Sequence, residues 1–182
     1  MPRLIKWLAA GGGLGYLPKA PGTAGSALGF LLGWWWPLAG WSWSSCLLVL
    51  GVVCLGAVIC TRAERLFQRH DPSCIVLDEI IGMWLVMAVA SPRRYWIVDP
   101  AGPHAALELA VMACDALLAF GLFRLFDIVK PAPLPWLARA PEGWGILLDD
   151  LGAGLYTLLS LGAFRLVVAI ANGSFAWWLI HR

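Results

Sequence analysis

Charged side chains are scarce in this chain of 182 residues: they make up 13%, whereas hydrophobic residues make up 60% and the mean hydropathy is +0.77. A soluble globular domain carries about 25% charged and about 45–50% apolar residues. A water-soluble fold of this size would therefore lack polar side chains to cover its surface. Disorder is excluded too, because it requires low hydrophobicity and high net charge. The composition predicts an integral membrane protein.

Several other sequence features are missing, and each absence excludes a class of function. The formal net charge is only +2, which supplies no basic surface for nucleic acid. The five cysteines form no C-x-x-C pair, so neither a disulfide framework nor a zinc site is expected. The glycines of residues 11–15 lack the G-x-G-x-x-G spacing, and no G-K-[ST] follows, which excludes the common nucleotide loops. With only three histidines, a multi-histidine metal site is not expected either.

Five apolar stretches predict membrane-embedded helices. They cover approximately residues 24–38, 43–60, 75–90, 105–126 and 148–170. A perpendicular crossing takes ~20 residues, with ~17–25 the usual range. The first and third stretches are short, so we expect them to extend into flanking residues, to thin the bilayer locally or to be partly re-entrant. The expected fold is an all-α, polytopic membrane bundle of about four to five membrane-embedded helices, forming one domain over residues 1–182.

Lysine and arginine are unevenly divided between the two sides of this bundle. With the N-terminus inside, nine lie on the inner side and three on the outer side. The inner set is Arg3, Lys6, Lys19, Arg62, Arg65, Arg69, Arg124, Lys130 and Arg139, and the outer set is Arg93, Arg94 and Arg182. Because positive residues prefer the cytoplasmic side, the N-terminus is predicted to be cytoplasmic.

A row of glycines at Gly25, Gly29 and Gly33 repeats every four residues in the first apolar stretch. Residues four apart share one helix face, and small side chains let two helices approach closely. We expect this row to be a helix-packing face.

Acidic residues stand out against the apolar background, since seven of the eleven lie inside or at the ends of the apolar stretches. They are Asp78, Glu79, Glu108, Asp115, Asp127, Asp149 and Asp150. A carboxylate at mid-bilayer costs ~2.5–3.5 kcal/mol or more, so each is a functional candidate. All except Glu108 and Asp115 are predicted at the cytoplasmic end, where they offer five carboxylates to one site. Hard oxygen ligands without cysteine favour Mg²⁺ over zinc.

Two pairs of adjacent acids, Asp78–Glu79 and Asp149–Asp150, can also be interpreted within their own helices. Asp78 and Glu79 are about 100° apart on a helix and cannot share a face, so one could bind a metal while the other serves a neighbouring helix or a water. Asp149 and Asp150 open the last stretch, where capping of a helix start is the simpler interpretation. Two adjacent acids entering an apolar run are less easily explained by capping.

Basic and hydroxyl side chains accompany the acids. Arg124, Asp127 and Lys130 are spaced by three and line one side of a helix end, which suits a phosphate beside a divalent metal. An ordinary intrahelical ion pair explains that spacing equally well. The turn at residues 21–23 places Thr23 where it would cap the next helix, whose N-terminus could bind an anion.

Four motifs in order resemble the phosphatidylglycerophosphatase A family. They are PGTAGS at residues 21–26, RHDPSCIVLDEIIGMW at 69–84, FRLFDIVKPAP at 123–133 and GWGILLDDLGAG at 143–154. The resemblance implies a Mg²⁺-dependent, multi-pass lipid phosphatase of the bacterial inner membrane, acting at its cytoplasmic face. It would hydrolyse phosphatidylglycerophosphate to phosphatidylglycerol and inorganic phosphate. The match departs from the family pattern between residues 91 and 114, where this chain carries extra residues.

The motifs fall on the positions already selected from the burial of charge. The expected metal ligands are Asp78, Glu79, Asp127, Asp149 and Asp150, and the expected phosphate contacts are Arg124, Lys130 and Thr23. The expected catalytic residues are Asp78, Glu79, Asp127, Asp150, His70 and Asp71. A free carboxylate, or His70 held by Asp71, would move the proton. Direct attack of water and a covalent aspartyl-phosphate both remain open.

Two other function classes fit parts of the pattern. A small ion- or proton-coupled transporter would use intramembrane acids, and Glu108 and Asp115 favour it because the phosphatase does not need them. A lipid-binding assembly factor without catalysis would need only the headgroup contacts.

Overall fold

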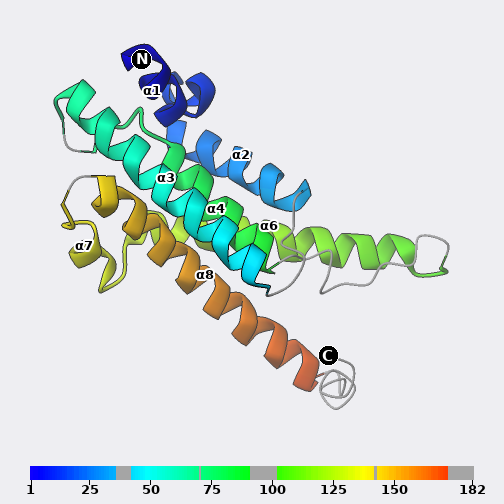
Figure 1. Ribbon diagram of the computed structural model, residues 1–182. Helices are drawn as coiled ribbons and strands as arrows, with labels where there is room; N and C mark the ends of the chain where they lie inside the picture. Colours follow the sequence, from blue (N-terminus) through cyan, green and yellow to red (C-terminus); the bar gives the residue numbers. More distant parts are fainter. Residues whose placement is uncertain (36–41, 70, 91–101, 142, 172–182) are drawn as a thin grey trace.

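The structure is a computed structural model that describes residues 1–35, 42–69, 71–90, 102–141 and 143–171. Every regular element within these residues is helical, which confirms the all-α prediction. The elements are α1 (Pro2–Ala9), the 3₁₀ helix η1 (Gly11–Tyr16), α2 (Pro21–Trp35), α3 (Trp43–Phe67), α4 (Leu77–Ala90), α6 (Ala105–Val129), α7 (Leu134–Leu137) and α8 (Gly143–Ala171) (Figure 1).

Three of the described helices are long and apolar enough to cross a membrane: α3 and α6 with 25 residues each, and α8 with 29. The helices α2 and α4 are shorter, with 15 and 14 residues, as expected for the first and third apolar stretches. Large apolar side chains remain exposed on the long helices, among them Leu47 at 68%, Leu107 at 65% and Leu159 at 63%. Such an exterior suits lipid rather than water.

The short helix α4 lies at the centre of the bundle, where α2, α3, α6 and α8 all pack against it (Figure 1). Its residues Met83, Val86 and Met87 are fully buried, and Phe123 of α6 packs against the same cluster. The N-terminal end of α4 carries Asp78 and Glu79. Every surrounding helix is therefore held close to these two acids.

The glycine row of α2 is the face that packs on α4, as the sequence predicted. Gly25, Gly29 and Gly33 are all buried. A Cβ on Gly33 would lie 2.7 Å from the Trp84 carbonyl oxygen, and one on Gly29 would overlap the Ile80 carbonyl. The two helix backbones touch along this row, so no side chain fits between them.

A methyl group at this contact should weaken the fold. Because the atoms opposite Gly29 are backbone, Gly29→Ala should lower the unfolding free energy by about 2–3 kcal/mol, the upper range for overpacking. Thermal unfolding in detergent should show this as a fall of several degrees. The matched control is Gly162→Ala, since a Cβ at this helical glycine of α8 meets nothing within 4 Å. Equal melting temperatures for the two variants would contradict the close α2–α4 contact.

The helix α8 begins earlier than the sequence suggested. It starts at Gly143 rather than near residue 148, so Asp149 and Asp150 lie in its second turn and cannot cap its start. The first turn is held against α3, because the Gly143 N–H donates to Thr61 Oγ1 at 3.1 Å and a side chain at residue 143 would overlap the α3 backbone. This packing carries the two acids past the helix end into the interior.

Thr23 also differs from its predicted position. The helix α2 begins at Pro21, so Thr23 lies within its first turn, where it is exposed, and does not precede the helix as a cap.

An ion pair buried between α6 and α8 accounts for one of the unassigned acids. Arg165 Nη2 lies 2.5 Å from Asp115 Oδ2, and the two side chains are 11% and 2% exposed. Arg165 Nη1 also donates to the Ala90 carbonyl at 3.0 Å, which ties in the end of α4. Asp115 is therefore part of a buried structural contact.

Substituting only one residue of the Asp115–Arg165 pair should lower the unfolding free energy more than substituting both. Asp115→Asn leaves the Arg165 charge buried and should lower the unfolding free energy by about 3 kcal/mol or more. The double variant Asp115→Asn with Arg165→Gln leaves no buried charge and should recover at least half of that loss. Thermal melts of both variants and of Arg165→Gln complete the cycle. Strictly additive losses would contradict a direct pair.

Candidate active site

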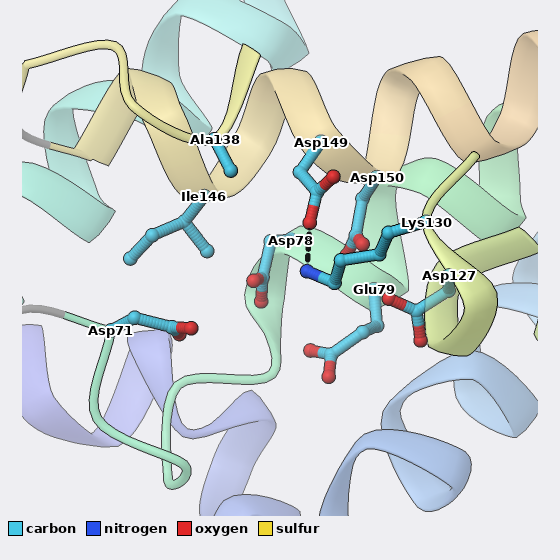
Figure 2. A pocket seen from close by; sticks show the side chains of 9 residues that line it. All are labelled: Asp71, Asp78, Glu79, Asp127, Lys130, Ala138, Ile146, Asp149 and Asp150. Carbon is cyan, nitrogen blue, oxygen red and sulfur yellow. Dashed lines mark hydrogen bonds and ion pairs between the residues drawn. The ribbon is translucent and has the colours of Figure 1, made fainter. Parts of the chain in front are cut away.

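The polar residues of four segments meet in a cavity of about 150 Å³ at the N-terminal end of α4 (Figure 2). The loop before α4 contributes Asp71, and α4 contributes Asp78 and Glu79. The end of α6 contributes Asp127 and Lys130, α8 contributes Ile146, Asp149 and Asp150, and Ala138 closes one side. All five predicted metal ligands line this cavity.

The acids of the cavity are deeply buried. Asp78 is 5% exposed, Asp149 4% and Asp150 3%. Gly82, one turn beyond Asp78, permits this crowding, because a Cβ there would lie 3.2 Å from the Asp150 Cβ and 3.0 Å from the Phe123 ring. Burying ionised carboxylates without partners is strongly unfavourable. Either compensating positive charge or protonation of some of the acids must therefore offset this cost.

The carboxylates form two groups of three in which one oxygen from each residue lies within 4.8 Å of the others. The first group is Asp78, Glu79 and Asp150, and the second is Asp127, Asp149 and Asp150. Asp78 and Glu79 belong to the same group, so one cation could contact both. Although their Cα–Cβ bonds point about 100° apart, the longer Glu79 side chain bends back toward the same point in front of the helix end.

Several oxygens in these groups have no hydrogen-bond partner although they are buried. They are Asp78 Oδ1, Glu79 Oε2, Asp149 Oδ1 and Asp150 Oδ2. A buried polar atom without a partner costs about 1–3 kcal/mol, and more when it is charged. Oxygen atoms from converging carboxylates are the ligands that Mg²⁺ prefers. The residues present therefore fit a divalent cation.

Lys130 brings positive charge to the cavity. It follows the last residue of α6 in a left-handed conformation with φ 48°, and its Nζ forms a short contact with Asp149 Oδ2 (Figure 2). Burial by itself would lower the pKa of Lys130, but the hydrogen bond to Asp149 and the charges of Asp149, Asp127 and Asp150 outweigh it and raise that pKa. Lys130 thus stays protonated at neutral pH.

Arg124 lies behind the cavity and does not line it. Its Nη1 donates to Asp127 Oδ2 at 2.6 Å and to Ser26 Oγ at 3.2 Å, and Ser26 Oγ donates to the Gly22 carbonyl at 3.0 Å. This chain of contacts connects Asp127 to the first turns of α2. Ser26 is fully buried, yet sequence reasoning gave it no role because a serine in an apolar helix carries no distinctive signal.

The remaining predicted site residues have different positions. Asp71 is exposed at the cavity edge with φ 47°, whereas Thr23 is exposed and does not line the cavity. His70 lies outside the described residues. Glu64, which sequence reasoning missed among the charges ending α3, is 7% exposed, and its Oε1 accepts the Asp71 N–H at 3.0 Å. Glu64 thereby holds the Asp71 loop against the bundle.

The fold and the cavity define a helical membrane protein with a carboxylate-rich, lysine-containing site at one end of its bundle. The chain belongs to the phosphatidylglycerophosphatase A family, whose model matches residues 7–165. That range includes every residue that lines the cavity.

Three similar proteins match most of the chain. Phosphatidylglycerophosphatase A of Escherichia coli is 33% identical over 149 residues, which cover 81% of this chain and 76% of the relative. The Haemophilus influenzae protein of the same name is 33% identical over 165 residues, or 88% of each chain. A Bacteroides thetaiotaomicron protein, provisionally named phosphatidylinositol-3-phosphatase, is 32% identical over 171 residues, covering 88% of this chain and 93% of the relative. No solved structure matches the chain.

Proposed function

We propose that this protein hydrolyses the phosphomonoester of phosphatidylglycerophosphate to phosphatidylglycerol and inorganic phosphate. Family membership and the names of two relatives support this substrate. The observation that carries the proposal is the cavity itself, in which six carboxylates and a protonated lysine converge within a membrane bundle. Such a site suits a phosphate group delivered together with a divalent cation.

Mg²⁺ is the proposed cofactor, held by Asp78, Glu79, Asp127, Asp149 and Asp150. When bound, it would supply Lewis-acid polarisation of the phosphoryl oxygens. The buried, unpartnered carboxylate oxygens support this assignment, because a bound cation would compensate them.

The chain itself would orient the phosphate and move a proton. Lys130 lines the cavity and would balance negative charge on the transferring phosphoryl group. Arg124 holds Asp127 in place from behind. Asp71 belongs to neither carboxylate group and lies at the cavity edge, so it is free to accept a proton from water. As the water oxygen bonds to phosphorus, the bond to the glycerol oxygen breaks, and that oxygen takes up the proton.

We propose in addition that the protein lies in the bacterial inner membrane with the cavity at its cytoplasmic face. The excess of lysine and arginine predicted on that side supports this orientation. A phosphomonoester headgroup would then enter from the leaflet that adjoins the cavity.

Phosphatidylinositol 3-phosphate is a second candidate substrate, favoured by the name of the Bacteroides relative. A transporter has little support in comparison. Asp115, one of the two acids that favoured it, is paired with Arg165.

Phosphate release by the purified protein tests the proposal. Equal amounts of phosphatidylglycerophosphate, phosphatidylinositol 3-phosphate and phosphatidic acid are offered in mixed micelles, with Mg²⁺ titrated and EDTA as the control. We expect the fastest release from phosphatidylglycerophosphate and none with EDTA. Faster release from phosphatidylinositol 3-phosphate would transfer the assignment to that lipid. No release from any of the three would refute a lipid phosphatase.

A further inference from the structure

We propose that the cavity holds two divalent cations, with Asp150 shared between them. Asp78 and Glu79 would complete the first cation site, and Asp127 and Asp149 the second. This inference extends the magnesium site of the proposed function and rests on it for the identity of the metal. The number of cations and the division of the ligands go beyond family membership.

The geometry supports two sites rather than one. The carboxylates fall into two groups that overlap only at Asp150, each with its oxygens within 4.8 Å of one another. Ligand oxygens on opposite sides of one Mg²⁺ are about 4.2 Å apart, because each Mg–O distance is about 2.1 Å. Each group therefore has the size of one coordination sphere after a small side-chain adjustment.

Each group also contains buried oxygens without partners. Asp78 Oδ1 and Glu79 Oε2 belong to the first group, and Asp149 Oδ1 belongs to the second. Asp150 Oδ2, in the shared residue, has no partner either. Asp78, Asp149 and Asp150 are each at least nine-tenths buried. A single cation in either group would leave oxygens of the other group without a partner.

The sum of the charges around the cavity also favours two cations. Six carboxylates line the cavity, with Asp71 at its edge, and Lys130 and Arg124 are the cations in contact with them, so the fully ionised cavity would carry four uncompensated negative charges. One divalent cation would leave two negative charges, whereas two would balance all four. A phosphomonoester carries about −1.5 to −2 at neutral pH. A cavity with one cation would stay negative and repel such a group, whereas a cavity with two would not, and a carboxylate can bridge cations at the ~3.5–4 Å separation of two-metal phosphatases.

Manganese binding to the purified full-length protein in neutral detergent tests this proposal without substrate. Mn²⁺ is titrated, and free and bound ions are separated by electron paramagnetic resonance. The wild-type protein should bind two Mn²⁺ per chain, with a spin-coupled signal from the pair. Glu79→Gln and Asp127→Asn should each bind one uncoupled ion. Asp150→Asn should weaken both sites at least tenfold and remove the coupling.

The matched control is Asp71→Asn, which changes a carboxylate at the cavity edge that belongs to neither group. It should bind two ions. Helix content by circular dichroism and elution in gel filtration check that each variant is folded. One Mn²⁺ per chain in the wild-type protein would overturn the proposal, as would loss of all binding in both Glu79→Gln and Asp127→Asn.

The readout separates this inference from the proposed activity. Two bound ions without phosphate release from any lipid would leave the metal centre standing and refute the phosphatase. Phosphate release with a single bound ion would support the phosphatase and refute the two-cation centre.

Discussion

Asp150→Asn should reduce phosphate release from phosphatidylglycerophosphate by about 10³-fold or more. Asp150 is 3% exposed and is the only residue common to both carboxylate groups among the described residues. A catalytic metal contributes several kcal/mol to transition-state stabilisation, and each 1.36 kcal/mol corresponds to a factor of ten in rate. Asparagine keeps the shape of the side chain but removes the charge that holds the cation. Initial rates at saturating Mg²⁺ measure the effect.

The same substitution should make the metal-free protein more stable. Without a cation, the buried carboxylates repel one another and lack solvation, so removing one charge relieves both costs. The melting temperature of Asp150→Asn in EDTA should therefore be above that of the wild-type protein. This opposite change in activity and stability separates a site residue from a structural one.

Thr157→Val is the matched control for this variant. Thr157 is fully buried two turns further along α8, and its hydroxyl donates to the Ala153 carbonyl of the same helix. The substitution removes a buried polar group of similar size without reaching the cavity, so release should remain close to wild type. Wild-type activity in Asp150→Asn, or an equal loss in Thr157→Val, would remove Asp150 from the site.

Lys130→Gln should lower kcat/KM by about 10²-fold. Lys130 is the cation among the nine residues that line the cavity, and its raised pKa keeps it charged. Loss of one preorganised group that stabilises transition-state charge typically costs about 10²–10³-fold. We expect the lower end because the Lys130 side chain is 41% exposed and water can replace part of its effect. Glutamine retains a donor of similar length, so the loss reports the charge.

Lys19→Gln removes the same charge from an exposed position outside the cavity and serves as the control. Its kcat/KM should stay within about twofold of wild type, since an isolated surface charge contributes little. Both variants are compared in micelles of one composition, so that general attraction of anionic lipid affects them equally. Equal values for the two variants would show that Lys130 acts only through overall charge.

Local features of the sequence were sufficient for the class of fold and for most of the cavity. The scarcity of charge predicted the membrane, and the glycine row predicted the face of α2 that packs on α4. Burial of a carboxylate is so costly that Asp78, Asp127 and Asp150 stood out without any knowledge of their neighbours. All three line the cavity.

Contacts between segments that are distant in the sequence were not predicted from these local features. Arg165 and Asp115 are fifty positions apart, and no spacing rule within one helix pairs them. Glu64 resembled an ordinary charge at the end of α3, although it binds the backbone of Asp71. Thr23 occupied a plausible capping position in the sequence, but the helix starts before it.

The sequence by itself determined that this is a helical membrane protein with its functional acids at helix ends, because composition and periodicity act within each segment. Only the tertiary structure decided how those acids are grouped. The packing of α8 against α3 carries Asp149 and Asp150 into the interior, and Gly82 lets α4 come close to them. Which carboxylates share a cation depends on distances between helices, and those distances are set by side chains that meet only after the bundle has assembled.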